Sequence, residues 1–124
     1  MPVITPAQAT VYRYADNHWH SFVSPRSGSQ QLCAWRIDIP AGTLSTPHRV
    51  NREEVLYVLT GSITVTLAGV TETAGPGDAV FIPADTPVRV DNLGDETASA
   101  WVTTGTGFEG TFDDGTTFVP EWVR

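Results

Sequence analysis

Residues 42–61 read GTLSTPHRVNREEVLYVLTG and give the clearest indication of the fold. Five residues separate the first glycine from His48, and six separate Glu54 from the last glycine. Because successive side chains of a β-strand point to opposite faces, His48 and Val50 share one face of a strand, and Glu54 and Leu56 share one face of the next. A histidine and a carboxylate on aliphatic faces are costly to bury unless they are paired or bind something. The stretch therefore predicts two strands that carry candidate functional residues.

The same two-residue period recurs along the rest of the chain. Residues 33–39 alternate apolar and polar side chains, and residues 62–67 do so again. Further short apolar or alternating runs are residues 55–59, 79–82, 88–91 and 98–104, with a last hairpin from residues 108–112 and 116–119. Residues 5–9 offer one helical turn at most. Many short strands separated by turn residues predict an all-β, antiparallel sandwich or barrel.

Composition excludes several classes of function. The 124 residues include no lysine, which rules out a lysine Schiff base, pyridoxal phosphate anchored to a lysine, and a P-loop. A net charge of −7 opposes binding to nucleic acid and to anionic membrane surfaces. A single cysteine forms no intramolecular disulfide, and the N-terminus shows no secretory signal, so we expect a cytoplasmic protein. The length predicts one domain over residues 1–124.

The stretch quoted above resembles the first sequence motif of the cupin superfamily. In that motif a glycine is followed by a His-x-His pair, a glutamate and a second glycine. The chain matches it at residues 42–61 with Gly42, His48, Glu54 and Gly61. Val50 stands where the family has its second histidine.

A weaker resemblance to the second cupin motif follows at residues 77–92. The matching residues are Gly77, Pro83 and Asn92. Asp85 stands where the family has a glycine, and Val88 where it has a metal-binding histidine. The short spacer, residues 62–76, is similar to that of small single-domain cupins. The resemblance covers about residues 35–103 and implies an antiparallel jelly-roll β-barrel.

The resemblance also implies a metal site in the barrel, formed by histidines and a glutamate. Of those ligands the chain keeps only His48 and Glu54. Two ligands are fewer than a catalytic zinc or non-haem iron site uses, and valine cannot donate to a metal. We therefore predict that Val50 and Val88 replace metal-binding histidines and that the protein needs no cofactor. The alternative is a divalent metal such as Fe, Mn, Ni or Zn on His48 and Glu54.

Other side chains offer donors for a rebuilt metal site. His18 and His20 have the spacing of a metal-binding pair on one strand face, but two surface histidines in an edge strand or loop are the simpler interpretation. Asn51 and Asp85 lie near the altered motif positions and would supply oxygen ligands.

Three polar residues near the motifs are expected to have structural roles. Cys33 shares the apolar face of its strand with Trp35, which predicts a buried core thiol; a nucleophile paired with His48 is the alternative. By alternation, Arg36 and Arg89 point away from the apolar face. We expect both to form surface ion pairs.

Without a metal, His48 is predicted to act as general acid/base, with Glu54 as its partner or as the residue that orients it. An apolar pocket raises the pKa of Glu54 unless His48 is protonated beside it. Such residues suit proton abstraction next to a carbonyl, dehydration, isomerisation or ring closure, so we expect an isomerase, cyclase or lyase (dehydratase). The predicted substrate pocket is lined by Trp35, Val50, Leu56 and Val88. This lining favours an uncharged or weakly polar organic substrate.

Three other interpretations stay open on sequence grounds. One is a metal-dependent cupin oxygenase with a rebuilt ligand set, and another is a non-catalytic barrel that binds a small ligand. In the third, His48 and Glu54 form a hydrogen-bonded relic in a filled core. By resemblance to cupins we also expect a homodimer, in which residues 116–122 (TTFVPEW) cover the barrel mouth or pack on the partner subunit.

Overall fold

The computed structural model describes residues 2–124, and Met1, the first residue of the predicted domain, lies outside that range. Two sheets of six strands each form the described part. The first sheet contains β1 (Thr10–Tyr14), β2 (Asn17–Val23), β3 (Leu32–Ile39), β5 (Glu54–Thr60), β8 (Ala79–Ile82) and β10 (Ala98–Gly105). The second contains β4 (His48–Val50), β6 (Ile63–Leu67), β7 (Val70–Ala74), β9 (Val88–Asp91), β11 (Gly110–Phe112) and β12 (Thr117–Phe118). The predicted all-β class is confirmed.

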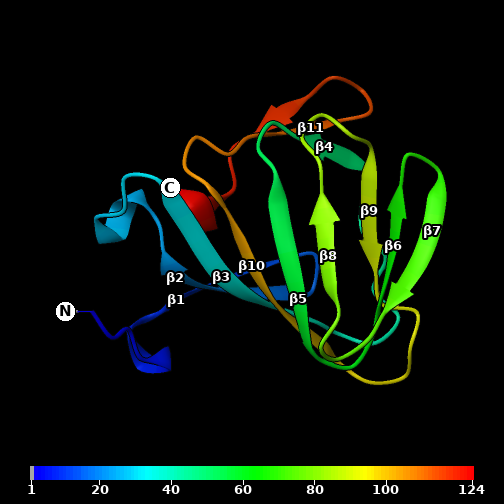
Figure 1. The fold of residues 1–124 in the computed structure, drawn as a ribbon, viewed down its shortest axis with the longest axis horizontal. Coiled ribbons are helices and arrows are strands. Elements are labelled where there is room, and N and C mark those ends of the chain that lie inside the picture. Colours follow the sequence, from blue (N-terminus) through cyan, green and yellow to red (C-terminus); the bar gives the residue numbers. More distant parts are fainter. Residues whose placement is uncertain (1) are drawn as a thin grey trace.

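The two sheets face each other as the layers of a jelly roll. Their strand orders are β1-β2-β3-β10-β5-β8 and β12-β11-β4-β9-β6-β7, and neighbouring strands run antiparallel. Figure 1 shows β3, β10 and β5 in one layer and β9, β6 and β7 in the other. The helices of the described part are three short 3-10 turns, η1 (Pro6–Gln8), η2 (Pro25–Ser27) and η3 (Glu121–Val123). The single turn expected near residues 5–9 is η1.

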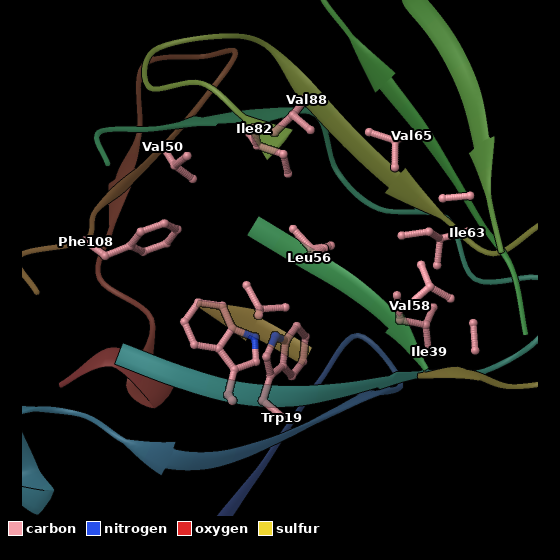
Figure 2. Packing of buried hydrophobic residues seen from close by; sticks show 14 of the residues in the cluster. Trp19, Ile39, Val50, Leu56, Val58, Ile63, Val65, Ile82, Val88 and Phe108 are labelled. Atoms are coloured by element: carbon pink, nitrogen blue, oxygen red, sulfur yellow. The ribbon is translucent and has the colours of Figure 1, made fainter. Parts of the chain in front are cut away.

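Alternation along each strand decides which side chains enter the core between the sheets. On β3, Cys33 and Trp35 point inward and are 0% and 4% exposed. Figure 2 shows Val50 and Val88 from the second sheet pointing toward the same interior as Leu56. Burial raises the pKa of the Cys33 thiol, which contacts the Val123 carbonyl oxygen at 3.7 Å. The predicted buried core thiol is confirmed.

Outward positions of the same strands carry the ion pairs expected there. The Arg36 guanidinium lies 3.1 Å from the Asp38 carboxylate, and that of Arg89 lies 3.2 Å from Asp91. Burial alone would raise the pKa of Asp38, but hydrogen bonds from Arg36 and Ser99 outweigh it and hold that pKa below its ordinary value. The Arg36 pair is partly exposed, as expected, whereas the partner of Arg89, Asp91, is buried and only 5% exposed.

The histidine pair near the N-terminus lies deeper in the first sheet than an edge strand would place it. His18 and His20 belong to β2, which has β1 and β3 as its neighbours. The Nε2 atom of His20 lies 2.9 Å from Asp38 and 3.1 Å from the Arg36 guanidinium. The sequence missed this arrangement because Asp38 is eighteen residues away along the chain.

The C-terminal segment packs on its own chain. The Trp122 ring stacks on Trp19 with centroids 4.1 Å apart, and the Ser21 hydroxyl donates to the Trp122 carbonyl at 3.0 Å. Val123 follows and is only 3% exposed. Trp122 thus packs on β2 of its own chain, and the two roles expected for residues 116–122 stay predictions.

The two glycines at the ends of the first motif, Gly42 and Gly61, differ in how much space surrounds them. Both adopt left-handed backbone angles, φ +74° at Gly42 and +68° at Gly61. A Cβ on Gly61 would lie 2.8 Å from the Ala98 Cα and the Thr97 carbonyl oxygen, whereas nothing lies within 4 Å of one on Gly42. Of these two glycines, only Gly61 therefore has the backbone of another segment, residues 97–98, close to its Cα.

Gly61→Ala is expected to destabilise the protein more than Gly42→Ala. The left-handed conformation alone costs a non-glycine residue about 1–2 kcal/mol, and the clash with backbone atoms adds about 1–3 kcal/mol at Gly61. Urea unfolding of both variants measures the difference. Equal losses of stability would mean that the close approach at Gly61 is relieved at no cost.

Candidate functional site

His48 begins β4, and its ring is held in one tautomer. Its Nδ1 atom lies 2.9 Å from the Thr46 carbonyl oxygen. Because a carbonyl oxygen only accepts hydrogen bonds, Nδ1 carries the hydrogen, and the lone pair of the neutral ring is on Nε2. Within residues 2–124, Nε2 has no hydrogen-bond partner. His48 thus presents a free basic nitrogen.

Glu54 begins β5 and points into the core. It lies between Ile82 on β8 and Thr104 on β10 in the strand register, and only 8% of its surface is exposed. The Thr104 hydroxyl donates to the Glu53 carbonyl at 2.7 Å instead of to this carboxylate. Among the described residues, the Glu54 side chain has no hydrogen bond and no ion pair. Burial raises its pKa from 4.5 to about 7.

His48 and Glu54 belong to opposite walls of the barrel. His48 is on the second sheet, where it shares the inner face with Val50 and pairs with Val88, and both valines are at most 2% exposed. Glu54 is on the inner face of the first sheet. Facing sheets pack about 10 Å apart, and no hydrogen bond or ion pair joins the two residues in the part of the chain described. They are separate groups facing one interior.

The four residues predicted to line a substrate pocket all belong to the hydrophobic core. Trp35, Val50, Leu56 and Val88 are 4%, 1%, 4% and 2% exposed. Of these four, only Val50 also lines a surface depression, which has a volume of about 440 Å³. These four residues thus belong to one packed cluster between the walls that carry His48 and Glu54, and their role as a pocket lining stays a prediction.

The sequence interpretation missed three aromatic residues around this interior. Phe108 is 5% exposed, and its ring meets that of Trp35 edge-on at 6.1 Å. Phe112 pairs with His48 in the register of β11 and β4. The Phe118 ring stacks on Phe112 at 4.5 Å and lies edge-on to the His48 ring at 6.1 Å. Alternation along 108–112 was the available signal, but it does not show which strands these residues join.

Of the two residues considered as oxygen ligands, Asn51 uses its side chain in hydrogen bonds to the backbone. The Asn51 side-chain amide donates to the Gly107 carbonyl at 3.0 Å and accepts from the Glu109 backbone N–H at 2.6 Å. These bonds fix the loop that carries Phe108. The Asp85 backbone N–H donates to the Val50 carbonyl at 2.7 Å, and Asp85 lines the surface depression.

The donor set does not fit a metal centre. Within residues 2–124, no three His, Cys, Asp or Glu side chains are grouped so that they could hold a metal ion. His48 and Glu54 stand on different sheets, and their partners in the strand register are Val88, Phe112, Ile82 and Thr104. The metal site that the sequence resemblance implied has too few ligands here.

The comparison with known families agrees with this architecture. Residues 35–104, more than half of the chain, match the cupin domain family. The chain is a cupin. No curated protein matches its sequence. Within residues 2–124, no helix of this cupin is long and apolar enough to cross a membrane.

Solved structures share the fold of this cupin at low sequence identity. The polyketide cyclase RemF from Streptomyces resistomycificus is 22% identical, with 85% of this chain and 79% of that one covered and a TM-score of 0.75. A sugar phosphate isomerase from Silicibacter pomeroyi is 17% identical, with 91% and 82% covered and a TM-score of 0.76. A predicted oxalate decarboxylase from Thermotoga maritima is 16% identical, with 83% and 97% covered and a TM-score of 0.73. At sequence identities this low, the similarity shows a shared fold alone.

Proposed function

We propose that this cupin is a small-molecule enzyme that transfers protons in the barrel interior, of isomerase, cyclase or lyase (dehydratase) type. The observation that carries the proposal is Glu54, a carboxyl group that is 8% exposed and has no hydrogen bond or ion pair in the described residues. Burial of a carboxyl group without an ion-pair partner disfavours its charged form and costs stability once it ionises. A substrate that hydrogen-bonds to it accounts for its retention. The cyclase and isomerase among the structural neighbours, which share this barrel, support the choice of reaction class.

In the proposed reaction the two groups act from opposite sides of a carbonyl compound. His48 Nε2 takes a proton from the carbon next to the carbonyl, and the resulting imidazolium keeps its Nδ1–H bond to Thr46. Glu54, which is protonated below pH 7, donates its proton to the carbonyl oxygen, and an enol forms. Returning a proton to another carbon completes an isomerisation. Attack of the enol carbon on a second carbonyl of the same molecule closes a ring.

The proposal is tested with 2-tetralone, a bicyclic ketone that loses hydrogens next to its carbonyl through an enol. In D2O, the protein is expected to accelerate exchange of these hydrogens, as followed by NMR. Saturable binding of 2-tetralone without exchange would favour the non-catalytic barrel and contradict the enzyme. Elemental analysis of untagged protein tests the metal alternative, which requires about one equivalent of Fe, Mn, Ni or Zn that is lost when His48 or Glu54 is replaced.

The exchange rate is expected to fall as the pH rises above about 7. The Glu54 pKa of about 7 means that the carboxylic acid form, which donates the proton, disappears through this range. Each further pH unit then lowers the rate about tenfold. Measuring the exchange rate from pH 5 to 9 tests this decrease. A rate that is still rising at pH 9 would show that the acid form of Glu54 is not required.

We also propose that this cupin is a homodimer and acts in the cytoplasm. Support for the dimer comes from the outer face of β5, where Val55, Tyr57 and Leu59 are 43%, 46% and 41% exposed. An antiparallel sheet that faces water alternates with polar residues, so an apolar outer face favours contact with another protein surface. Light scattering after size exclusion gives the mass. A monomer at micromolar concentration would contradict the dimer.

A further inference from the structure

Phe112 and Phe118, the aromatic wall, lie beside the ring of His48. Their rings stack at 4.5 Å with 25° between the planes, and the Phe118 ring meets the His48 ring edge-on. Phe112 is the register partner of His48, so both point to the inner face of the second sheet. The aromatic wall is therefore part of the barrel lining.

Gly110 determines where the Phe118 ring lies. Gly110 pairs with Val50 on one side and Phe118 on the other, and the Val50 side chain points into the core. A Cβ on Gly110 would overlap the Phe118 ring, so the ring occupies the space that a side chain at this position would fill. A glycine here allows the ring to cover the inner face of β11.

The aromatic wall differs from the buried aromatic residues on the other side of the interior. Phe108 and Trp35 are 5% and 4% exposed, whereas Phe112 and Phe118 are both only half-buried. Both residues of the aromatic wall are thus partly accessible next to the His48 ring, whose Nε2 has no hydrogen-bond partner in the described residues. Aromatic rings attract other planar rings in stacked or edge-on geometry beyond the effect of buried area alone.

We propose that the aromatic wall binds the flat face of a planar, conjugated ring whose hydroxyl group donates a hydrogen bond to His48 Nε2. The ligand class is therefore phenols and the enols of aryl ketones. This inference rests on the proposed function, because it places the substrate beside the same histidine. It adds the part of the substrate that the wall recognises, a ring with π faces, which the reaction class alone does not specify.

Binding of three matched bicyclic probes to the wild-type protein tests the inference without any variant. 2-Naphthol has both the planar ring and the donor, decahydro-2-naphthol keeps the donor on a saturated ring, and 2-methoxynaphthalene keeps the ring without the donor. Calorimetry is expected to give the tightest binding for 2-naphthol, with each of the other two weaker by about fivefold or more. Equal affinity for 2-naphthol and decahydro-2-naphthol would overturn the inference.

Variants then assign the ring preference to the aromatic wall. Phe118→Leu removes the π face of this residue. It is expected to lower the affinity for 2-naphthol about fivefold and to leave the affinity for decahydro-2-naphthol unchanged. Gly110→Ala displaces the Phe118 ring and is expected to do the same. Phe81→Leu is the matched control, because Phe81 is 53% exposed on the outer face of β8. Unchanged affinity of folded Phe118→Leu for 2-naphthol would contradict the role of the wall.

The test of this inference can fail independently of the test of the proposed function. If Phe118→Leu binds 2-naphthol as well as wild type while His48→Ala abolishes exchange in 2-tetralone, the inference fails and the proposed function stands. In the opposite case, neither wild type nor any variant accelerates exchange in 2-tetralone, but the affinity for 2-naphthol still falls in Phe118→Leu. The proposed reaction then fails, and the aromatic wall remains a binding surface for planar rings.

Discussion

Replacing Glu54 by glutamine is expected to raise the free energy of unfolding at pH 8 by about 3 kcal/mol. The carboxyl group has a pKa of about 7 in the folded protein and an ordinary value of 4.5, so the folded state holds its proton more tightly than the unfolded state. The stability that this proton contributes is complete below pH 4.5 and is lost as the pH rises through about 7. A difference of this size corresponds to about 3 kcal/mol. Glutamine stays neutral throughout and avoids the loss.

Urea unfolding of wild type and Glu54→Gln at several pH values between 4.5 and 8 measures this effect. Other titrating groups cancel in the difference between the two proteins, which should grow steadily with pH. Glu53→Gln is the matched control, since Glu53 is the exposed neighbour of Glu54 on the chain. Its difference from wild type should stay within about 0.5 kcal/mol. A pH-independent difference for Glu54→Gln would mean that Glu54 ionises as an exposed carboxyl group does.

Replacing His48 by alanine is expected to lower the rate of exchange in 2-tetralone by about 100- to 10,000-fold, the usual contribution of a positioned general base. His48 is half-buried, and its one hydrogen bond goes to the Thr46 carbonyl, so the variant should fold. Circular dichroism and urea unfolding check this. His18→Ala is the control, because His18 lies on β2 in the first sheet, whereas His48 lies on β4 in the second. Exchange should be unchanged in the control.

Local alternation predicted much of this fold from the sequence. The period of two along β3 placed Cys33 and Trp35 inside and Arg36 outside, because neighbouring side chains of a strand must take opposite faces. The motif spacing likewise placed His48 and Glu54 on consecutive strands that point to one interior. These are consequences of short-range geometry, which a sequence carries directly.

Contacts between distant segments were not predictable in the same way. The Ser21 hydroxyl bonds to Trp122, which is 101 residues further along the chain, and nothing in either segment indicates the other. Likewise, the sequence suggested a hydrogen-bonded pair of His48 and Glu54, whereas the strand order places them on different sheets. The sequence also did not predict the aromatic wall, because the positions of Phe112 and Phe118 depend on the pairing of β11 with β4.

The proposed action of His48 and Glu54 from opposite walls agrees with the observed environment of both groups. A hydrogen-bonded pair would lower the pKa of Glu54, because a donor stabilises the carboxylate, whereas burial without a partner raises it. The raised value keeps an acid available near neutral pH, while the bond to Thr46 keeps a base available on Nε2 of His48. The proposed reaction therefore has its proton donor on one wall and its proton acceptor on the other, with the buried side chains of Val50 and Val88 beside them.

The most direct test of this account is the exchange rate in 2-tetralone at pH 6, measured for chelator-treated wild type, His48→Ala, Glu54→Gln and the double variant. We predict that wild type is active and that either single change lowers the rate about 100-fold or more. The double variant should be little slower than the single ones, because both groups act in one step. Wild-type rates in His48→Ala would contradict proton transfer by these residues.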